Sequence, residues 1–525
     1  MNVKSLIKVS EYHDSVSLML VARELTKFPG VQDASVVMGT DANKALLEQS
    51  GLLTAEARQA TPNDLVISVK TPGNVEDALA EAEKLLHHKA VSDNTSEYRP
   101  KSIRSAAKTH PNANIAIISV AGRYAAEEAW EALFAGMHVL LFSDNVSKGD
   151  ELALKQYGRE HGLLVMGPGA GTAILNGTAL AFANVIPTGP VGIVSAAGTG
   201  LQETSTLLAK NGIGITQGIG TGGGDVKKEI GGIMYIEGLK ALQADPATEV
   251  ILMVSKLPDV EVEKILLEQV AASKKPTVIC LLGGKAREAN IPANATVCST
   301  LEEAALTAAK LAGAKIGDIK EKIAVETKEA ETLAKELKAH LKPGQKHLRC
   351  LFSGGTLCYE SQVIWRDGFN FDIYSNAPLD KHFKMQDSTR SEGNVAVDLG
   401  EEEFTVGRPH PMIDNDLRMR RILQEAADPS VAVIFLDVVI GYGAHPDPAA
   451  ELTDAIRKAA ALAKAQGREI IFVASVTGTE QDPQNLSRTT QTLEASGVHV
   501  MKSNAMASRL AGYIITDDGK RSENG

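Results

Sequence analysis

The stretch from Gly189 to Asp225, GPVGIVSAAGTGLQETSTLLAKNGIGITQGIGTGGGD, decides the fold of this chain. It begins with an apolar run, Val191 to Val194, which predicts a short buried strand. The small residues that follow predict a tight turn into a helix, and Thr199 with Gln202 has the spacing of a capping box at the helix start. Asn-Gly at 211–212 predicts the helix end, because both residue types tolerate left-handed backbone.

A glycine-rich turn of this kind has a chemical consequence. Where a strand passes through such a turn into a helix, backbone N–H groups stay unpaired, and the helix dipole adds about half a positive charge there. Phosphate or carboxylate fits at this end without a cationic side chain. The alternative is a plain strand-to-helix connection that binds nothing. The predicted donors are the backbone N–H groups of Ser195, Gly198, Thr199 and Gly200.

The same pattern returns near residue 350. Residues 351–360, LFSGGTLCYE, repeat the order seen from Ile193 to Glu203, one residue shorter: an apolar strand, Ser, small residues, Thr and a helix that carries Glu. Two helix starts suited to anions predict one site shared between two domains. The predicted donors of the second start are the N–H groups of Ser353, Gly354, Gly355 and Thr356. The residues predicted to border the pocket, with a flexible turn as the alternative, are Gly222, Gly223, Gly224 and Asp225.

The composition argues against several classes of function. A chain of 525 residues has the length of three or four domains. Its net charge of −11 argues against a nucleic-acid partner. Four cysteines, none in a CxxC pair, indicate neither a zinc site nor a disulfide framework and predict a cytoplasmic location. We expect no signal peptide and no membrane segment, since no apolar run approaches the roughly 18 residues of a membrane span.

Strand and helix patterns alternate along most of the chain. This predicts an α/β protein of several consecutive open, mostly parallel Rossmann-like or flavodoxin-like domains, and we expect a mostly parallel sheet already in the first 92 residues. Arg123 follows a strand end in the second domain, so it is a candidate contact for an anionic group, with a solvated loop arginine as the alternative. The predicted parts are an α/β domain at 1–92, a surface linker at 91–112, a Rossmann domain at 113–187, a flavodoxin-like domain at 188–315, a helical linker at 316–346 and a last α/β domain at 347–525.

A loop of the last domain carries the candidate catalytic side chains. Arg408 lies in Gly-Arg-Pro-His-Pro at 407–411, and its planar guanidinium matches a carboxylate or phosphate with two hydrogen bonds. His410 titrates near neutral pH between two prolines that fix its direction, so it is the candidate general acid or base. The alternative is that His410 caps a loop and that the prolines are structural. Asp437 follows a strand, and we expect a buried, hydrogen-bonded carboxylate there.

These motifs together resemble known proteins. The order of elements from 114 to 282 is similar to the α chain of succinyl-CoA synthetase, with Val165–Pro168, Gly192–Glu203 and Thr221–Asp225 at matching strand ends and loops. The last domain resembles the ligase domain of that enzyme's β chain, fused into one polypeptide. Segments at 14–19, 61–64, 142–146, 405–414 and 436–441 resemble the FdrA family, and this resemblance covers nearly the whole chain.

The chain departs from the synthetase where that enzyme carries out its chemistry. Residues 283–298 contain no histidine, although the synthetase relays a phosphoryl group through one after the corresponding strand. The N-terminal CoA phosphate loop and an ATP-grasp domain have no clear counterpart, and Ala170 stands where the family pattern has cysteine. The phosphohistidine cycle is therefore not carried over.

The resemblance to FdrA implies a component of an oxamate carbamoyltransferase in anaerobic allantoin and ureide breakdown. That reaction converts oxalurate and phosphate to oxamate and carbamoyl phosphate, an acyl phosphate of the kind that the synthetase scaffold handles. Phosphate would be a co-substrate, and the partners would be an anionic small molecule and other subunits of the pathway, in an oligomer. Two alternatives stay open: an ADP-forming acyl-CoA synthetase that binds CoA and ADP with magnesium, and a non-catalytic subunit that binds an anion and organises its partners.

Overall fold

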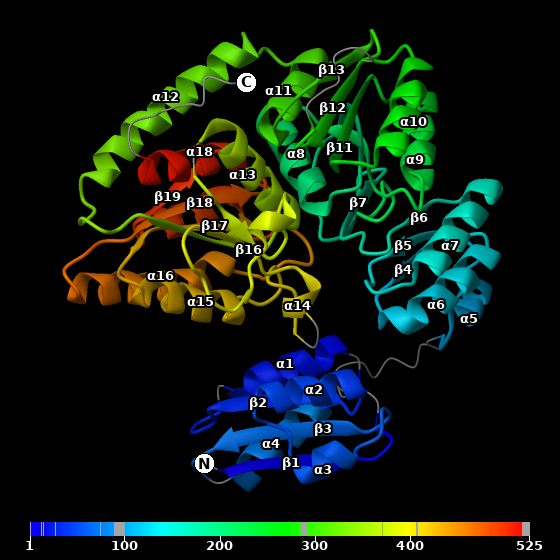
Figure 1. Cartoon of the computed structure of the whole chain (residues 1–525). Helices are drawn as coiled ribbons and strands as arrows, with labels where there is room; N and C mark the ends of the chain where they lie inside the picture. The colour runs from blue at the N-terminus through cyan, green and yellow to red at the C-terminus, as the bar shows by residue number, and fades with distance from the viewer. Residues whose placement is uncertain are drawn as a thin grey trace. The chain divides into compact units, whose positions relative to one another are not determined.

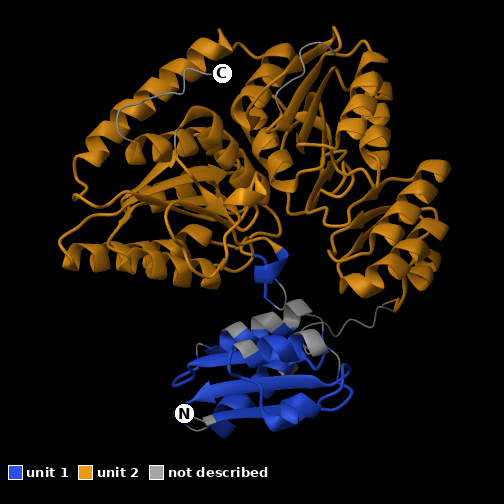
Figure 2. Cartoon of the chain, in the orientation of Figure 1, with its two compact units in different colours: residues 1–99, 402–410 blue, residues 100–401, 411–525 orange. Residues whose placement is uncertain are grey.

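The computed structural model describes residues 2–11, 13, 15–26, 28–73, 75–88, 100–284, 291–369, 371–405 and 408–516. The chain forms two compact units, one of residues 1–99 with 402–410 and one of residues 100–401 with 411–525 (Figure 2). The predicted linker at 91–112 lies partly outside the described residues. Its described part contains a short helix, α5 (Ile103–Thr109), which the polar sequence did not predict and which Ser102 and Ser105 stabilise with a capping box.

The sheet of the first unit is antiparallel, so the prediction of a mostly parallel sheet is wrong for this part. Strand β3 lies between β1 and β2 and runs antiparallel to both. Alternation of strands and helices does not by itself fix strand direction, and here the chain returns through two short helices before it forms the central strand. The elements are β1 (Asn2–Lys8), α1 (Ser15–Thr26), β2 (Asp33–Met38), α2 (Asp41–Gln49), α3 (Ala55–Gln59), β3 (Leu65–Thr71), α4 (Val75–His88) and, in the second segment of this unit, α14 (Glu402–Thr405).

The second unit begins with a small parallel sheet of Rossmann type. Its strand order is β4-β5-β6, and both pairings are parallel. A cis Gly167-Pro168 bond follows β6 and leads the chain into the next sheet. After α5, the elements are β4 (Ile115–Ile118), α6 (Gly122–Phe134), β5 (His138–Leu141), α7 (Lys148–His161) and β6 (Val165–Met166).

The central sheet has the strand order β13-β12-β11-β9-β10-β7-β8. From β10 to β13 all pairings are parallel, and numbered along the chain they give the flavodoxin-like order 2-1-3-4-5. The hairpin β7–β8, absent from the sequence prediction, adds antiparallel strands at the edge. The elements are β7 (Thr172–Leu175), β8 (Thr178–Ala181), β9 (Thr188–Ser195), α8 (Gly198–Lys210), β10 (Ile215–Gly220), α9 (Ile233–Ala244), β11 (Val250–Lys256), α10 (Val260–Ala271), β12 (Thr277–Leu282), β13 (Ala295–Val297) and α11 (Leu301–Leu311).

The last sheet repeats this arrangement. Its order is β15-β16-β14-β17-β18-β19 with every pairing parallel, and the five strands from β16 to β19 again follow the order 2-1-3-4-5. The elements are β14 (His347–Phe352), α13 (Gly355–Gly368), β15 (Tyr374–Ser375), the 3-10 helix η2 (Lys381–Phe383), β16 (Val395–Asp398), α15 (Asp416–Ala427), β17 (Val431–Val439), α16 (Pro448–Ala465), β18 (Ile471–Thr477), α17 (Leu486–Glu494), β19 (Val498–Met501) and α18 (Asn504–Ile515).

One hydrophobic core runs through both large sheets. It includes Ile193 and Leu201 of the central sheet and its first helix, and Phe352 and Trp365 at the equivalent places of the last sheet. Helices α8 and α13 are buried along most of their length because each lies between the two sheets (Figure 1). The predicted helical linker is α12 (Ile319–Lys338), which packs against α18.

Candidate functional site

The two helix starts that the sequence singled out lie against each other. α8 follows β9 and α13 follows β14, and each of these strands stands where the order of its sheet reverses, the place where open α/β sheets bind ligands. The N–H of Thr356 donates to Thr199 Oγ1 at 3.2 Å. A Cβ on Gly200 would lie 3.0 Å from Thr356 Cγ2, and one on Gly354 would lie 3.0 Å from Thr199 Cγ2, so this approach depends on glycine.

The start of α8 keeps unpaired donors. Ser195 Oγ is turned inward, where it accepts from Ala197 N–H at 3.0 Å and donates to Ala197 O at 2.8 Å. Within the described part of the chain, no hydrogen bond takes up the N–H groups of Gly198, Thr199 or Gly200. With the positive end of the helix dipole, these groups can hold an anion.

The predicted capping box at this helix is wrong. The residue before the helix is Ala197, and no side chain caps the helix start. Thr199 lies inside the first turn, where its hydroxyl oxygen accepts a hydrogen bond from the N–H of Thr356 in the neighbouring helix. A partner more than 150 residues away has therefore replaced the local one.

The start of α13 already holds an anion, the carboxylate of Asp437. Ser353 N–H and Gly354 N–H both donate to it at 2.7 Å, and Ser353 Oγ donates at 3.0 Å. Arg418, 2% exposed, forms an ion pair with the same carboxylate at 3.2 Å. The structure therefore assigns the Ser353 and Gly354 N–H groups to an internal carboxylate instead of an external phosphate. Among the four predicted donors, only Gly355 N–H has no acceptor in the described part of the chain.

The glycine loop after β10 divides into an outer and an inner part. Gly223 is exposed, and a Cβ there would lie 3.7 Å from Ala196 O, beside the start of α8. Gly222 has a φ of +83° and packs on the backbone of Pro168, and Gly224 packs on the Glu151 side chain. Only the outer part of the loop is therefore placed to meet a ligand.

Asp225 faces inward and does not border the site, which corrects its predicted role. Its carboxylate accepts from Met234 N–H at 3.2 Å and from Tyr235 N–H at 2.6 Å, at the start of α9. It also pairs with Lys155 at 2.9 Å, and Lys155 pairs with Glu151 at 3.1 Å. Lys155 and Asp225 are fully buried, so this ionic cluster is a structural link between α7 and the loop.

The sequence did not predict two charged residues that lie beside α13, where the central and last sheets meet. Asp398 ends β16 and is 2% exposed, and a Cβ on Gly355 would lie 2.5 Å from its Oδ2. Lys256 ends β11, and its Nζ lies 5.3 Å from the centre of the Tyr359 ring. Burial raises the pKa of Asp398 to about 7, although the nearby Lys256 charge acts to lower it. Both residues stand at the carboxyl ends of predicted strands, which is the signal that could have found them.

Two glutamates link the two halves of the second unit, which are the central sheet with its helices and the last sheet with its helices. Glu203 of α8 accepts from Asn504 N–H at 3.0 Å, at the start of α18. Glu360 of α13 accepts from Leu301 N–H at 2.7 Å, at the start of α11, and from Asn504 Nδ2 at 2.8 Å. Each half thus caps the last helix of the other. The repeated Ser, Thr and Glu in the sequence occupy equivalent positions in two similar sheets.

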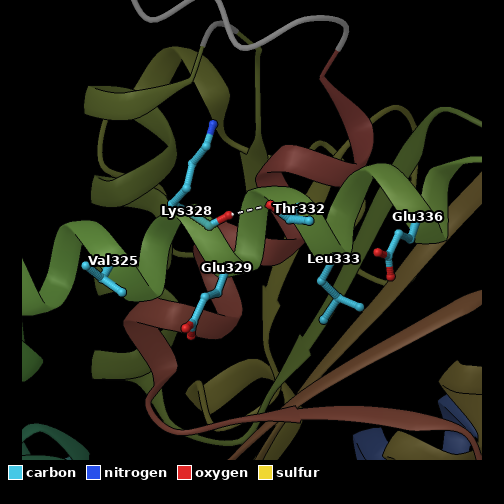
Figure 3. A pocket seen from close by; sticks show the side chains of 6 residues that line it. All are labelled: Val325, Lys328, Glu329, Thr332, Leu333 and Glu336. Atoms are coloured by element: carbon cyan, nitrogen blue, oxygen red, sulfur yellow. Dashed lines mark hydrogen bonds between the residues drawn. The ribbon is translucent and has the colours of Figure 1, made fainter.

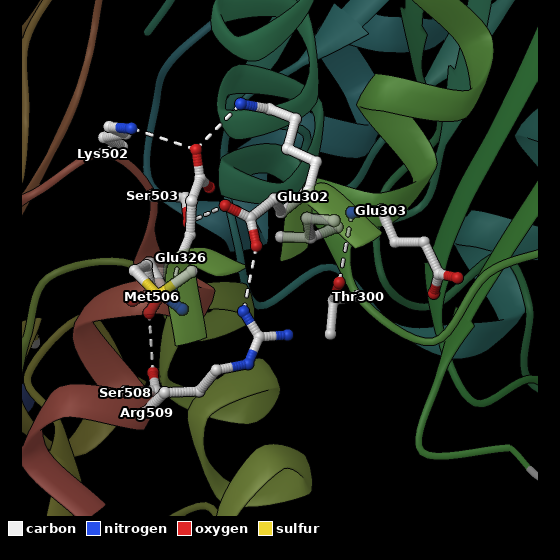
Figure 4. Close-up of polar contacts among 12 residues, drawn as sticks. Thr300, Glu302, Glu303, Glu326, Lys502, Ser503, Met506, Ser508 and Arg509 are labelled. Carbon is white, nitrogen blue, oxygen red and sulfur yellow. Dashed lines mark hydrogen bonds and ion pairs between the residues drawn. The ribbon is translucent and has the colours of Figure 1, made fainter. Parts of the chain in front are cut away.

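Charged side chains extend this network toward the surface (Figure 4). Glu302 of α11 accepts from Ser503 Oγ at 2.7 Å and pairs with Arg509 at 3.0 Å. Glu326 of α12 pairs with Lys502 at 3.0 Å. These contacts join α11 and α12 to the segment that begins α18, and they hold the central sheet, which carries the α8 start, against the last sheet, which carries the α13 start.

Glu360 predicts a pH dependence of stability. Burial raises its pKa from 4.5 to about 7, so between these values the folded state binds a proton that the unfolded state has released. Its contribution to the free energy of unfolding therefore falls as the pH rises through this window, by on the order of 3 kcal/mol in total. Glu360→Gln keeps an acceptor for Leu301 N–H, and Asn504 Oδ1, buried without a partner, can accept from the new amide.

We expect the unfolding temperature of Glu360→Gln to fall less than that of the wild type between pH 5 and pH 7.5, measured by scanning calorimetry. Glu237→Gln, at an exposed ion pair of α9, is the control and should follow the wild-type profile. Identical profiles for Glu360→Gln and the wild type would contradict the assignment.

The other predicted site residues are Arg408, His410 and Arg123. Arg408 and His410 belong to the segment 402–410 of the first unit, where Arg408 is exposed and its N–H donates to Thr405 O at 3.2 Å. The Arg123 guanidinium lies 4.8 Å from the centre of the exposed Tyr124 ring. Catalysis by Arg408 and His410 and anion binding by Arg123 stay predictions.

Two surface hollows are found elsewhere in the second unit. The larger, of about 480 Å³, follows one face of α12 (Figure 3), and its lining residues are Val325, Lys328, Glu329, Thr332, Leu333 and Glu336. The other, of about 340 Å³, is lined by Gly177, Ala179, Asn184, Val185, Ile186 and Tyr442. Neither includes the start of α8. No helix in the described residues has the length and apolar character needed to cross a membrane.

The CoA-ligase family model matches residues 351–514, which include most of the last sheet and its helices. A model described as AllF, heavy metal-associated domain, matches residues 1–101. The chain is 43% identical over 519 residues to YahF of Escherichia coli (strain K12), across 98% of this chain and 99% of that protein. It belongs to the YahF family.

Other similar proteins are ligases and lyases. Over 215 residues the chain is 27% identical to the succinate–CoA ligase [ADP-forming] subunit alpha 1 of Archaeoglobus fulgidus, covering 39% of this chain and 72% of that subunit. A structure of ATP citrate lyase from Methanothrix soehngenii, in complex with citrate and coenzyme A, aligns at 13% identity and a TM-score of 0.36, covering 79% of this chain and 84% of that one.

The first unit does not have the donor set of a thiolate metal site. All four cysteines lie outside residues 1–101, at positions 280, 298, 350 and 358. In the loop after β1, His13 Nε2 lies 2.9 Å from Glu11 Oε1, and the described residues contain no group of three metal-ligating side chains arranged around one point. We therefore derive no step from a heavy metal.

Proposed function

We propose that the chain acts on an acyl group carried as an acyl phosphate, in the manner of ADP-forming acyl-CoA ligases. The observation that carries this proposal is the row of unpaired N–H groups from Gly198 to Gly200, at the strand-order reversal of the central sheet. The CoA-ligase match over 351–514 and the similarity to an ADP-forming ligase subunit support it. Because the start of α13 is filled by Asp437, the ligand phosphate belongs to α8.

The α8 start would act by electrostatic stabilisation. The N–H groups of Gly198, Thr199 and Gly200 would donate to the phosphoryl oxygens before and during acyl transfer. Because these donors are already in place when negative charge develops on the oxygens, the protein does not have to reorganise in the transition state. The outer Gly223 gives access to this turn without a side chain. This chain would thus supply the anion-binding framework, and other subunits would complete the site.

A second candidate is the oxamate carbamoyltransferase reaction, in which phosphate cleaves oxalurate to oxamate and carbamoyl phosphate. Carbamoyl phosphate is itself an acyl phosphate, so the same α8 start would hold it. The AllF-type domain at 1–101 supports a place in ureide breakdown. The absence of histidine from residues 283–298 also favours direct acyl transfer over a phosphohistidine relay.

The proposed site is tested by removing one donor. Gly198→Pro deletes an N–H at the first position of α8, where proline suits the helix and the preceding Ala197 is already extended. A hydrogen bond to a charged group contributes about 1.5–3 kcal/mol, so we expect phosphate and carbamoyl phosphate to bind roughly 10- to 100-fold more weakly by titration calorimetry. Val260→Pro, at the first position of α10, is the matched control and should bind as the wild type does.

Turnover separates the two candidates. The chain with its co-purified partners is given ATP, CoA and a carboxylic acid while ADP is followed, or oxalurate and phosphate while carbamoyl phosphate is followed. ADP release dependent on CoA favours the ligase, and carbamoyl phosphate formation favours the carbamoyltransferase. Phosphate binding that Gly198→Pro leaves unchanged would overturn the proposal.

A further inference from the structure

Strand β4 is an open edge of the small parallel sheet. It pairs with β5 on one side and with no described strand on the other (Figure 1). Asn114 O accepts from His138 N–H at 2.8 Å, and Ile118 O accepts from the N–H that follows β5 at 3.0 Å. Alternate residues of a strand turn their backbone groups to opposite sides, so the N–H and C=O groups of Ile115 and Ile117 point away from β5. Among the described residues, no hydrogen bond takes up these groups.

The sequence of this edge does not discourage a further strand. Residues 112–122, NANIAIISVAG, contain no charged residue and no proline. Soluble proteins usually protect an open edge with lysine, proline or a covering segment, and edge strand β1 of the first unit carries Lys4 and Lys8. In contrast, β4 leaves Ile117 51% exposed, and Val120 just beyond the strand is 42% exposed. The edge therefore offers both backbone hydrogen bonds and apolar contact to an extended segment.

The chain segment around β4 has only positive charges. Residues 100–126 contain no Asp or Glu, although the whole chain has a net charge of −11. The cations of this segment, in chain order, are Lys101, Arg104, Lys108 and Arg123. Arg104 pairs with Glu131 at 2.6 Å, whereas the other three are exposed and form no ion pair within the described part of the chain. Lys108 precedes the strand and Arg123 follows it, so a cation lies beyond each end of the open edge.

We propose that β4 binds an extended, acidic segment of a partner protein, which adds to the sheet as a further strand. Its backbone would pair with Ile115 and Ile117, and carboxylates at its two ends would meet Lys108 and Arg123. A second copy of this chain fits less well. Antiparallel pairing of β4 with itself would bring Lys108 of one copy toward Arg123 of the other, and like charges oppose association. The inference does not depend on the proposed acyl-phosphate chemistry.

The experiment measures binding of a labelled peptide to the full chain by fluorescence anisotropy. The probe is Asp-Val-Thr-Val-Thr-Val-Glu with capped ends, whose acids at both ends suit either strand direction. The control peptide has lysine in place of both acids. At low ionic strength we expect the acidic peptide to bind about tenfold or more tightly than the lysine peptide. High salt should reduce this difference, because exposed charges are screened.

Two variants separate the backbone contribution from the charges. Ile117→Pro removes an outward N–H and leaves the pairing with β5 intact, and its ring takes up space that the added strand needs. It should weaken the acidic peptide about tenfold or more, whereas Ile117→Val keeps the N–H and should bind as the wild type does. Lys108→Glu combined with Arg123→Glu should reverse the preference in favour of the lysine peptide. The charge control is Lys240→Glu combined with Lys264→Glu, at exposed lysines of α9 and α10, and it should keep the wild-type preference.

Three binding results would overturn the proposal: the acidic peptide does not bind, the two peptides bind equally well, or Ile117→Pro with an unchanged circular dichroism spectrum binds the acidic peptide as the wild type does. Light scattering tests the other occupant. A wild-type dimer that Ile117→Pro converts to a monomer would show that a second copy covers β4, and it would also overturn the proposal. An equal mass for both proteins, together with the expected peptide preferences, would support the acidic partner.

Discussion

Replacing Lys155 by methionine should lower the free energy of unfolding by about 3–5 kcal/mol, since removing one partner of a buried ion pair leaves an uncompensated charge. Lys155 lies between Glu151 at 3.1 Å and Asp225 at 2.9 Å, and it also donates to Thr221 O at 3.1 Å. All of these contacts are buried. The substitution keeps the length of the side chain and removes only its charge and its donors.

Urea denaturation followed by circular dichroism measures this effect. Lys240→Met removes the exposed pair with Glu237, at 2.9 Å, and should cost no more than about 1 kcal/mol. Because the buried cluster joins α7 to the loop after β10, the Lys155 variant should also expose that loop to proteases. A Lys155→Met midpoint equal to the control's would refute a structural role for the cluster.

Replacing Asp437 by alanine should also lower the free energy of unfolding by about 3–5 kcal/mol, because the Arg418 charge would stay buried without its carboxylate. Ser353 and Gly354 would lose the acceptor of two backbone donors at 2.7 Å. The start of α13 would then become an anion site of the kind that α8 already offers. Added phosphate should therefore raise the unfolding temperature of Asp437→Ala more than that of the wild type.

A double-mutant cycle provides the control for this prediction. Arg418→Met leaves the Asp437 carboxylate buried without its cation, whereas the double variant leaves neither charge unpaired. The double variant should thus lower the free energy of unfolding by about 1–3 kcal/mol less than the sum of the two single variants. Additive losses, together with no extra response of Asp437→Ala to phosphate, would show that the carboxylate does not fill the helix start.

The repeated strand, turn and helix could be predicted from sequence because each depends on neighbours in the chain. The apolar run before Ser195 and the Asn-Gly after Lys210 mark the ends of β9 and α8, and the structure confirms both elements. The same holds for β14 and α13. The spacing of glutamate in both repeats also held a signal, since Glu203 and Glu360 take equivalent positions. The sequence did not indicate that each would cap a helix of the opposite half.

Strand direction and the occupation of the helix starts could not be predicted in this way. Alternating strands and helices are compatible with either sheet type, and only the path of the chain through α2 and α3 made the first sheet antiparallel. Asp437 is more than 80 residues from Ser353 in the sequence, so the residues near the glycine turn do not indicate which carboxylate accepts from the N–H groups at the start of α13. Asp398 and Lys256 each end a predicted strand, but the strands belong to different sheets, so the sequence did not show that the two charges act on each other.

The sequence by itself determined the α/β class and the pair of glycine-rich helix starts, because hydrophobic period, turn chemistry and helix ends are short-range properties of the chain. Only the tertiary structure decided which helix start is open. At α13 a buried aspartate and a threonine from α8 take up the donors, while at α8 the N–H groups from Gly198 to Gly200 have no acceptor among the described residues. The reason is physical: a backbone N–H donates to whichever carboxylate or hydroxyl oxygen the packing of distant strands brings within about 3 Å, and the spacing of residues in the sequence does not determine that packing.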